Sequence, residues 1–314
     1  MLEMIGKVLP IIILFSIGVW FKYSNFILDQ SMRDIKKIVI NVALPCVLCN
    51  TFLDMNIKPE HGMLAILTLI LLFLFMACSK LLNSIPILHY KYNVYVSTGY
   101  GFGLMGMTLF IMMFGEENLE MFSVMGLAHE FFIWIVYYIM FRIEMKNEKI
   151  DVYMFINVFK SPIILGILIG LLANFTGVYT YLNANPIGQG IFNTMDYLSN
   201  ISAPFILISL GYGTEINKNY LGKSFKLILL RAITIISVGI AVKVLLIDNL
   251  MPYSLLLDVS YIAFLAMPPM LVLPLLISQI EGEKEHEEIV SSAMGICSIL
   301  NIIIFILIAF TMPL

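Results

Sequence analysis

Long, uninterrupted runs of apolar residues follow one another along almost the whole chain. A helix needs about 20 predominantly apolar residues to cross the hydrocarbon core of a membrane. Runs of about 19 to 25 residues, separated by short polar segments, can be marked in ten places. The pattern therefore predicts ten membrane-spanning helices, near residues 4–22, 34–54, 62–83, 93–114, 119–141, 156–176, 190–212, 224–247, 253–277 and 288–312.

Composition agrees with this pattern and excludes a soluble fold. Hydrophobic residues make up 60% of the 314 residues and charged residues 12%, whereas about 25% of an ordinary soluble domain is charged. So few charged side chains cannot cover an apolar surface of this size. The net charge of −3 offers no basic surface for a nucleic acid. The sequence predicts an all-α protein of the lipid bilayer with no nucleic-acid partner.

Lysine and arginine residues collect in every second loop, which is informative because short cytoplasmic loops are enriched in these cations. Fifteen of the 18 cationic residues lie in or beside the loops after the first, third, fifth, seventh and ninth runs, and only Lys7, Lys58 and Lys243 lie elsewhere. The odd-numbered loops are therefore predicted to be cytoplasmic. Both termini should be external, in a multi-pass protein of the plasma or inner membrane.

Two short patterns recur at about half the length of the chain. The residues from Pro10 to Gly18 share five of nine positions with those from Pro162 to Gly170, and Asn41 to Pro45 resembles Asn200 to Pro204. Because five is an odd number, a second set of five spans would be inverted relative to the first. Inverted repeats are typical of secondary transporters, whose sites lie near the middle of the membrane between the repeats. The predicted repeats occupy residues 1–150 and 151–314.

The fourth and ninth runs contain residues that interrupt a helix. Four glycines lie between Gly99 and Gly106. Each lowers helix stability by about 1 kcal/mol relative to alanine, although small residues also permit close helix packing. In the ninth run, Pro268 and Pro269 remove two consecutive backbone donors. Two interrupted helices at matching positions of the two halves indicate a transport site.

The order and position of these motifs resemble the auxin efflux carrier family, which includes bacterial malate permeases. The resemblance rests on Asn41-x-x-Leu44-Pro45, Gly103-x-x-Gly106 and Ala266-Met267-Pro268-Pro269. It implies that spans four and nine cross at broken segments, while spans one, two, six and seven form a scaffold that dimerises. It also implies that the other spans carry a small carboxylate in an elevator-like motion. Members often have Asn and Pro where this chain has Gly101 and Thr108.

On this resemblance, substrate-binding residues are expected in both interrupted segments and helix-bridging residues in the scaffold. The substrate-binding candidates are Gly101, Gly103, Gly106, Thr108, Met267, Pro268 and Pro269. The helix-bridging candidates are Asn41, Pro45, Asn200 and Pro204. The expected substrate is a small organic anion, and the expected oligomer is a homodimer.

Two titratable side chains, His129 and Glu130, lie at the middle of the fifth run. An ionisable group at this depth is a functional hypothesis by default. Burial favours the uncharged carboxyl group, whereas a protonated His129 would favour the carboxylate, so the two residues are predicted to exchange a proton as a unit. A structural hydrogen-bonded pair between helices is the alternative. Arg231, about two turns inside the eighth run, is expected to extend its charged end to the cytoplasmic face.

Other functional classes find little support in the sequence. No HExxH motif, paired aspartates or Ser/His arrangement occurs within a span, so the chain is predicted not to be an enzyme, with no catalytic residue, metal or cofactor. The alternative function is a sodium- or proton-coupled carrier of the bile-acid or sodium–proton antiporter type with a non-carboxylate substrate. Such carriers usually place carboxylates or other polar side chains at the crossing, which here contains chiefly Thr98, Thr108 and backbone groups. A proton and a sodium ion both remain candidates for the coupling ion.

Overall fold

The structure is a computed structural model that describes residues 2–53, 58–146, 160–213, 218–278 and 280–312. Over these ranges the chain is predominantly helical and contains no β-strand, only an isolated antiparallel bridge between Tyr100 and Pro269. Helices are the expected elements because a backbone in lipid must pair its own N–H and C=O groups. The predicted all-α membrane class is therefore confirmed at this level.

Within the described ranges, five helices are long and apolar enough to cross a membrane: Asp29–Leu53, Pro59–Asn83, Glu120–Lys146, Lys218–Leu250 and Lys284–Thr311. The apolar helices Leu9–Tyr23, Ile164–Phe175 and Leu255–Ala266 are shorter. Two of the ten predicted spans, 93–114 and 253–277, are interrupted, and a turn at Ile201 divides the span predicted at 190–212. Part of the span predicted at 156–176 lies outside the described residues. Ten crossings therefore remain a prediction.

The chain forms two compact units, and each unit is assembled from several separate segments. Unit 1 comprises the described residues of Met1–Lys58, Gly103–Ser123 and Asp151–Gly213. Its elements include α1 (Leu2–Tyr23), α2 (Asp29–Ile38), the π-helical turn η1 (Val39–Ala43), α3 (Leu44–Leu53), α6 (Met107–Phe114), η3 (Glu116–Asn118), α10 (Pro162–Phe175), α11 (Val178–Asn183), α12 (Pro186–Asn200) and α13 (Ser202–Gly213).

Unit 2 comprises the described residues of Pro59–Phe102, Val124–Ile150 and Thr214–Leu314. It contains α4 (Pro59–Asn83), α5 (Asn93–Thr98), most of α7 (Glu120–Phe132), η4 (Ile133–Tyr137), α8 (Tyr138–Lys146), η5 (Lys218–Tyr220), α14 (Leu221–Val242), η6 (Lys243–Ile247), α15 (Asp248–Leu250), α16 (Leu255–Ala266), α17 (Leu273–Ile277) and α18 (Lys284–Thr311). The boundary between the units falls within the π-helical turn η2 (Phe102–Gly106). The repeat boundary predicted at residue 150 lies outside the described residues.

Glycines allow two pairs of helices to pack closely within unit 1. In α1, a Cβ atom at Gly18 would lie 2.0 Å from the carbonyl oxygen of Ile208 in α13. In α10, a Cβ atom at Gly170 would lie 2.6 Å from the carbonyl oxygen of Cys49 in α3. Membrane helices associate through such small residues because lipid provides no hydrophobic driving force between them. Unit 1 therefore contains the pairs α1–α13 and α3–α10.

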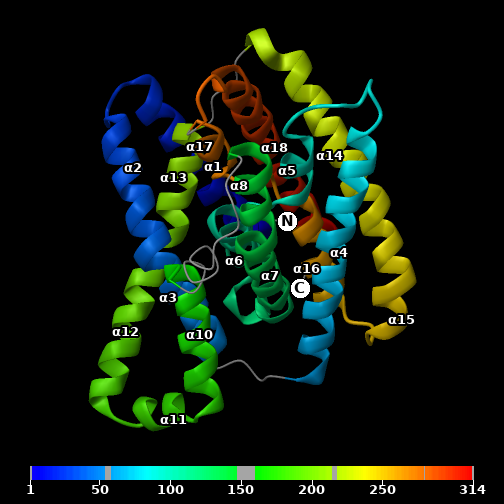
Figure 1. The fold of residues 1–314 in the computed structure, drawn as a ribbon. Coiled ribbons are helices and arrows are strands. Elements are labelled where there is room, and N and C mark those ends of the chain that lie inside the picture. The colour runs from blue at the N-terminus through cyan, green and yellow to red at the C-terminus, as the bar shows by residue number, and fades with distance from the viewer. Residues whose placement is uncertain (1, 54–57, 147–159, 214–217, 279, 313–314) are drawn as a thin grey trace. The chain divides into compact units, whose positions relative to one another are not determined.

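The connection that follows α10 in unit 1 is itself helical. Gly177, with φ of 70°, ends the first helix, and the short α11 leads to α12 (Figure 1). The side chain of Asn185 accepts a hydrogen bond from the backbone nitrogen of Gly188 at 2.8 Å, and Pro186 occupies the first turn. An asparagine cap followed by proline is a strong helix start, because the first N–H groups of a helix have no intrahelical acceptor. The asparagine oxygen accepts from one of them, and proline has no N–H group to satisfy.

Helix α14 lies at the centre of the packing in unit 2. It contacts α4, α5 and α18, and Figure 1 shows α14 and α4 as neighbouring long helices. Its buried positions include Leu227, Leu230, Arg231 and Thr234, which recur at three- and four-residue spacing along one face. Arg231 is the charged residue on this buried face, and its guanidinium reaches the interrupted helices α5 and α16.

Polar side chains join the segment before α5 to the start of α18. The ammonium group of Lys91 lies 2.5 Å from Glu283, and the Tyr92 hydroxyl donates to the same carboxylate at 2.9 Å. Burial raises the pKa of Glu283, but these two hydrogen bonds outweigh it, so the pKa lies below its ordinary value of 4.5. A lowered carboxyl pKa stabilises the fold above the ordinary value, and this contribution is lost as the pH falls through the lowered pKa.

Replacing Gly18 with alanine is expected to destabilise the protein, because the new methyl group would overlap the Ile208 carbonyl group. Overpacking of this kind lowers the free energy of unfolding by about 1–3 kcal/mol. The matched control is Gly6→Ala in the same helix, where a Cβ atom meets nothing within 4 Å. Thermal unfolding of the purified protein in detergent should give a lower midpoint for Gly18→Ala only. Equal midpoints for the two variants would contradict the close α1–α13 contact.

Candidate functional site

Two interrupted helices meet inside unit 2. Helix α5 ends at Thr98, and α16 ends at Ala266, so the predicted interruptions are confirmed. The extended segment after α5 pairs with the segment after α16 through the Tyr100–Pro269 bridge, and the Gly101 nitrogen donates to the Pro268 carbonyl oxygen at 3.0 Å. This meeting point brings together four predicted substrate-binding residues: Gly101, Met267, Pro268 and Pro269.

The local sequence explains why both helices end there. Proline removes a backbone donor and disfavours helical geometry in the preceding residue, and Met267 accordingly has φ of −57° and ψ of 147°. On the other segment, a Cβ atom at Gly101 would lie 3.3 Å from the Pro269 carbonyl oxygen, and one at Gly99 would lie 3.1 Å from Cβ of Met270. The two glycines therefore permit the backbones to approach.

A helix that ends in a low-dielectric interior leaves carbonyl groups without donors, and Arg231 of α14 supplies those donors. Its guanidinium group donates to the carbonyl oxygens of Val96, of Gly99 at 3.2 Å and of Met267 at 2.8 Å. The side chain of Asn301 in α18 donates to the neighbouring Ala266 carbonyl at 3.0 Å. One cation thus holds the carboxyl-terminal ends of α5 and α16 together.

The charge of Arg231 is fully enclosed. The residue is 4% exposed, and its guanidinium carbon lies 4.6 Å from the centroid of the Tyr100 ring, which is a cation–π distance. No carboxylate among the described residues lies within ion-pair distance of it. The expectation that Arg231 extends to the cytoplasmic face was therefore wrong, because the three carbonyl groups satisfy the guanidinium inside the protein.

His129 of α7 contacts the same interrupted segment. Its Nε2 atom accepts a hydrogen bond from the Tyr100 backbone nitrogen at 3.1 Å, and its ring lies among those of Tyr100, Phe102 and Phe264. Its Nδ1 atom lies 3.5 Å from a carboxylate oxygen of Glu130, whose other oxygen accepts from the Trp134 indole at 3.1 Å. The predicted pair is therefore close together, and both residues are buried.

Three buried polar atoms around the meeting point have no hydrogen-bond partner among the described residues. They are the Tyr100 hydroxyl, Nδ1 of His129 and Oδ1 of Asn301. Buried polar atoms are normally paired. The Tyr100 hydroxyl and Oδ1 of Asn301 are therefore available to a bound molecule, whereas Nδ1 of His129 faces Glu130 at 3.5 Å.

The remaining predicted residues belong to unit 1. Gly103 lies in η2, where a Cβ atom would be 3.6 Å from Leu44, while Gly106 precedes α6 and Thr108 is buried within it. Asn41 is exposed and donates to the Lys37 carbonyl one turn earlier in its own helix at 2.8 Å. Pro45 lies against Gly166 of α10, and Pro204 is half-buried in α13. The bridging role of these residues stays a prediction.

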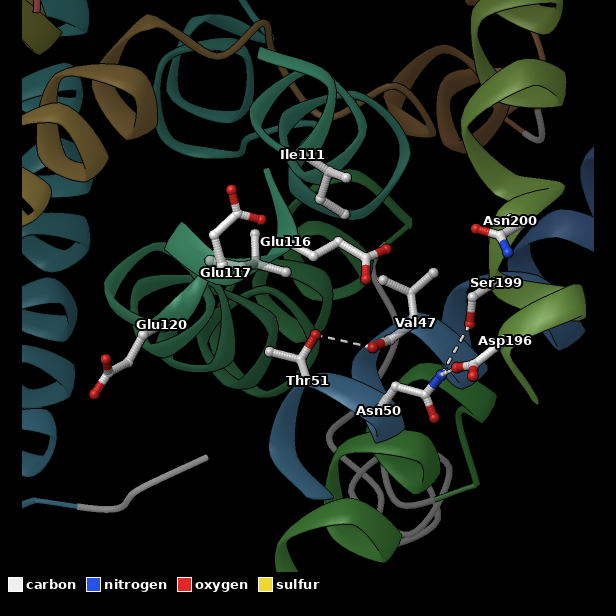
Figure 2. Close-up of a pocket in the computed structure, with 11 residues that line it drawn as sticks. Val47, Asn50, Thr51, Ile111, Glu116, Glu117, Glu120, Asp196, Ser199 and Asn200 are labelled. Atoms are coloured by element: carbon white, nitrogen blue, oxygen red, sulfur yellow. Dashed lines mark hydrogen bonds between the residues drawn. The ribbon is translucent and has the colours of Figure 1, made fainter. Parts of the chain in front are cut away.

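A separate hollow of about 640 Å³ lies within unit 1. Figure 2 shows Asn200, the last helix-bridging candidate, at its edge, and Asn50 bonded to Asp196 at 2.8 Å. Carboxylates dominate the polar lining, from Glu116, Glu117, Glu120 and Asp196. The hollow has the wrong charge for an organic anion, and we do not assign the transport site to it.

Sequence reasoning missed the roles of Arg231 and Asn301. The available signal was a polar residue well inside an apolar run, which by default marks a functional contact. The partners could not be read from the sequence, because both side chains donate to backbone carbonyls that every residue carries. Among the residues that the structure describes, no group of three His, Cys, Asp or Glu side chains could hold a metal ion.

No protein-family model matches the chain, and no curated protein matches it significantly.

Arg231→Gln is expected to lower the free energy of unfolding by about 3 kcal/mol or more, because several buried carbonyls lose a charged donor. Arg231→Lys should also destabilise, since an ammonium group lacks the planar fork that reaches several carbonyls at once. Lys226→Gln is the control, because Lys226 also lies on α14 and donates to a carbonyl, that of His89, in an exposed setting. Its effect should stay within about 0.5 kcal/mol. Chemical unfolding in detergent measures all three, and equal effects of Arg231→Gln and Lys226→Gln would contradict the assigned role.

Proposed function

We propose that the protein is a secondary transporter of a small organic anion. The observation that carries this proposal is the buried guanidinium of Arg231 at the meeting point of two interrupted helices, without a carboxylate partner among the described residues. Interrupted helices near the membrane centre are the usual place for a transport site. The proposed site includes Gly101, Met267, Pro268 and Pro269 of unit 2.

The occupied carbonyl groups favour an anion carrier over a sodium-coupled carrier. In many transporters, unwound carbonyls and the carboxyl-terminal ends of broken helices coordinate Na⁺. Each such end carries up to about half a negative charge, and the Arg231 guanidinium occupies the ends of both α5 and α16. Three of these carbonyls already accept hydrogen bonds from Arg231. A sodium ion would have to displace the arginine to use them.

The packing of unit 1 supports two inverted five-helix repeats. The predicted repeat equates α1 with α10 and α3 with α13, so it equates the pair α1–α13 with the pair α10–α3. Both pairs are present, and the equivalent glycines Gly18 and Gly170 each lie against a backbone carbonyl of the partner helix. A duplicated ancestor would place a small residue at the same contact in each half.

The division of the chain supports an elevator-type mechanism. Unit 1 contains the segments of predicted spans one, two, six and seven, the set that resembles the auxin efflux carrier scaffold. Unit 2 contains the meeting point and most of the remaining spans. We further propose that the chain crosses the cell membrane ten times with both termini external. We also propose that it belongs to the auxin efflux carrier family and forms a homodimer through the scaffold.

Uptake by proteoliposomes tests the function. When proteoliposomes with the wild-type protein are given a mixture of small dicarboxylates, amino acids and aromatic acids, they should accumulate at least one anion. Pro268→Ala combined with Pro269→Ala should abolish this uptake while membrane insertion is preserved, because the second helix could then continue through the meeting point. Pro86→Ala, in an exposed loop, is the control and should transport normally. Wild-type uptake by the double variant would place the site elsewhere, and sodium-dependent uptake of an uncharged solute alone would favour the alternative carrier.

A further inference from the structure

We propose that His129 and Glu130 form a proton-binding pair whose loading with a proton releases the interrupted segment at Tyr100. The physical linkage rests on contacts within unit 2, and its use in transport rests on the proposed function. The pair is buried, with His129 1% and Glu130 7% exposed. The sequence predicts that the pair exchanges a proton, and the structure adds the backbone group to which the exchange is linked.

The contact with Tyr100 determines where the histidine carries its proton. A backbone N–H group can only donate a hydrogen bond, so Nε2 of His129, at 3.1 Å, must accept it and carry no proton. A neutral imidazole then carries its proton on Nδ1. That atom lies 3.5 Å from Oε1 of Glu130 and has no hydrogen bond to any described residue. The resting pair is therefore a neutral histidine whose N–H faces a carboxylate.

Adding a proton changes which hydrogen bonds the pair can make. The second oxygen of Glu130 accepts from the Trp134 indole at 3.1 Å, so exchange with His129 takes place through Oε1. If the carboxyl group donates to Nδ1, the histidine must carry its own proton on Nε2. If the histidine is instead an imidazolium ion, both ring nitrogens carry protons. Each loaded state in which the added proton lies on Oε1 facing Nδ1, or on the imidazole, therefore places a proton on Nε2, opposite the Tyr100 N–H.

Two donors cannot share a hydrogen bond, so proton loading must break the Tyr100 contact. Tyr100 forms the bridge to Pro269, and its ring lies under the guanidinium of Arg231. Proton uptake is thus linked to the segment that separates α5 from η2. A His–Glu pair with a purely structural role would not exchange a proton, so the backbone contact would stay unchanged.

The groups packed around the pair come from several elements of unit 2. The interrupted segment contributes Tyr100, and α14 contributes Arg231, whose guanidinium lies over the Tyr100 ring. Helix α16 presents Phe264, and the chain beyond Tyr100 presents Phe102. With the Tyr100 contact intact, the resting histidine is neutral and carries its proton on Nδ1.

Trp134 offers a direct readout that requires no substrate. Trp20 is the other tryptophan of the chain, so Trp20→Phe leaves the indole that donates to Glu130 as the sole tryptophan fluorophore. We expect its emission, in protein reconstituted into nanodiscs, to change in a transition between pH 5 and 9. Adding Glu130→Gln should remove this transition. A transition that persists in the Glu130→Gln protein, or its absence from the Trp20→Phe protein, would overturn the proton-binding role.

Hydrogen exchange at the Tyr100 amide tests the linkage in the wild-type protein. After correction for the intrinsic pH dependence, exchange should be roughly tenfold faster in the loaded state than at high pH, because the contact with Nε2 is lost. His129→Gln should exchange at a pH-independent corrected rate, since an amide oxygen can accept from the backbone but does not titrate in this range. Equal pH dependence in both proteins would overturn the linkage. Neither experiment uses transport, so their failure leaves anion uptake standing, and failure of uptake leaves the proton site standing.

Discussion

A helix that ends inside a membrane protein must give its last carbonyl groups a donor, and the structure depends on how this requirement is met. In unit 2, two helices end within the interior, and one guanidinium group serves both. An unpaired buried carbonyl costs about 1–3 kcal/mol, so Arg231 permits an arrangement that the apolar surroundings would otherwise disfavour. The glycines and prolines make the interruption possible, and the arginine makes it stable.

The same interaction bears on function. Because the carbonyl ends are occupied by an internal cation, they are not available as a cage for Na⁺, and the meeting point has no carboxylate partner for Arg231 among the described residues. This arrangement favours an anionic substrate. It also separates two roles, since Arg231 fixes the helix ends while His129, which accepts from the Tyr100 backbone nitrogen, is proposed to exchange a proton.

Sequence reasoning predicted the features that depend on backbone chemistry alone. The helical class follows from the apolar runs, and the interruptions follow from Pro268, Pro269 and the glycines, because these residues act on their own backbone. The role of Arg231 was not predictable in this way. Position along a helix suggested an exposed charge, whereas the folded chain brings carbonyls from two other helices to it. Likewise the sequence placed Glu130 beside His129 but could not show that Tyr100 donates to the other ring nitrogen.

Solid-state NMR on the protein in liposomes tests the central claim, that the Arg231 guanidinium holds the end of α16. Methionine labelled with ¹³C at the carbonyl and arginine labelled with ¹⁵N in the guanidinium group would be incorporated together. The nitrogen–oxygen distance of 2.8 Å to Met267 places the carbonyl carbon within about 4 Å of the nitrogen. We predict dipolar dephasing of one methionine carbonyl signal that disappears in the volume-conserving variant Met267→Leu. Dephasing that is unchanged by this substitution, or absent from the wild-type protein, would contradict the account.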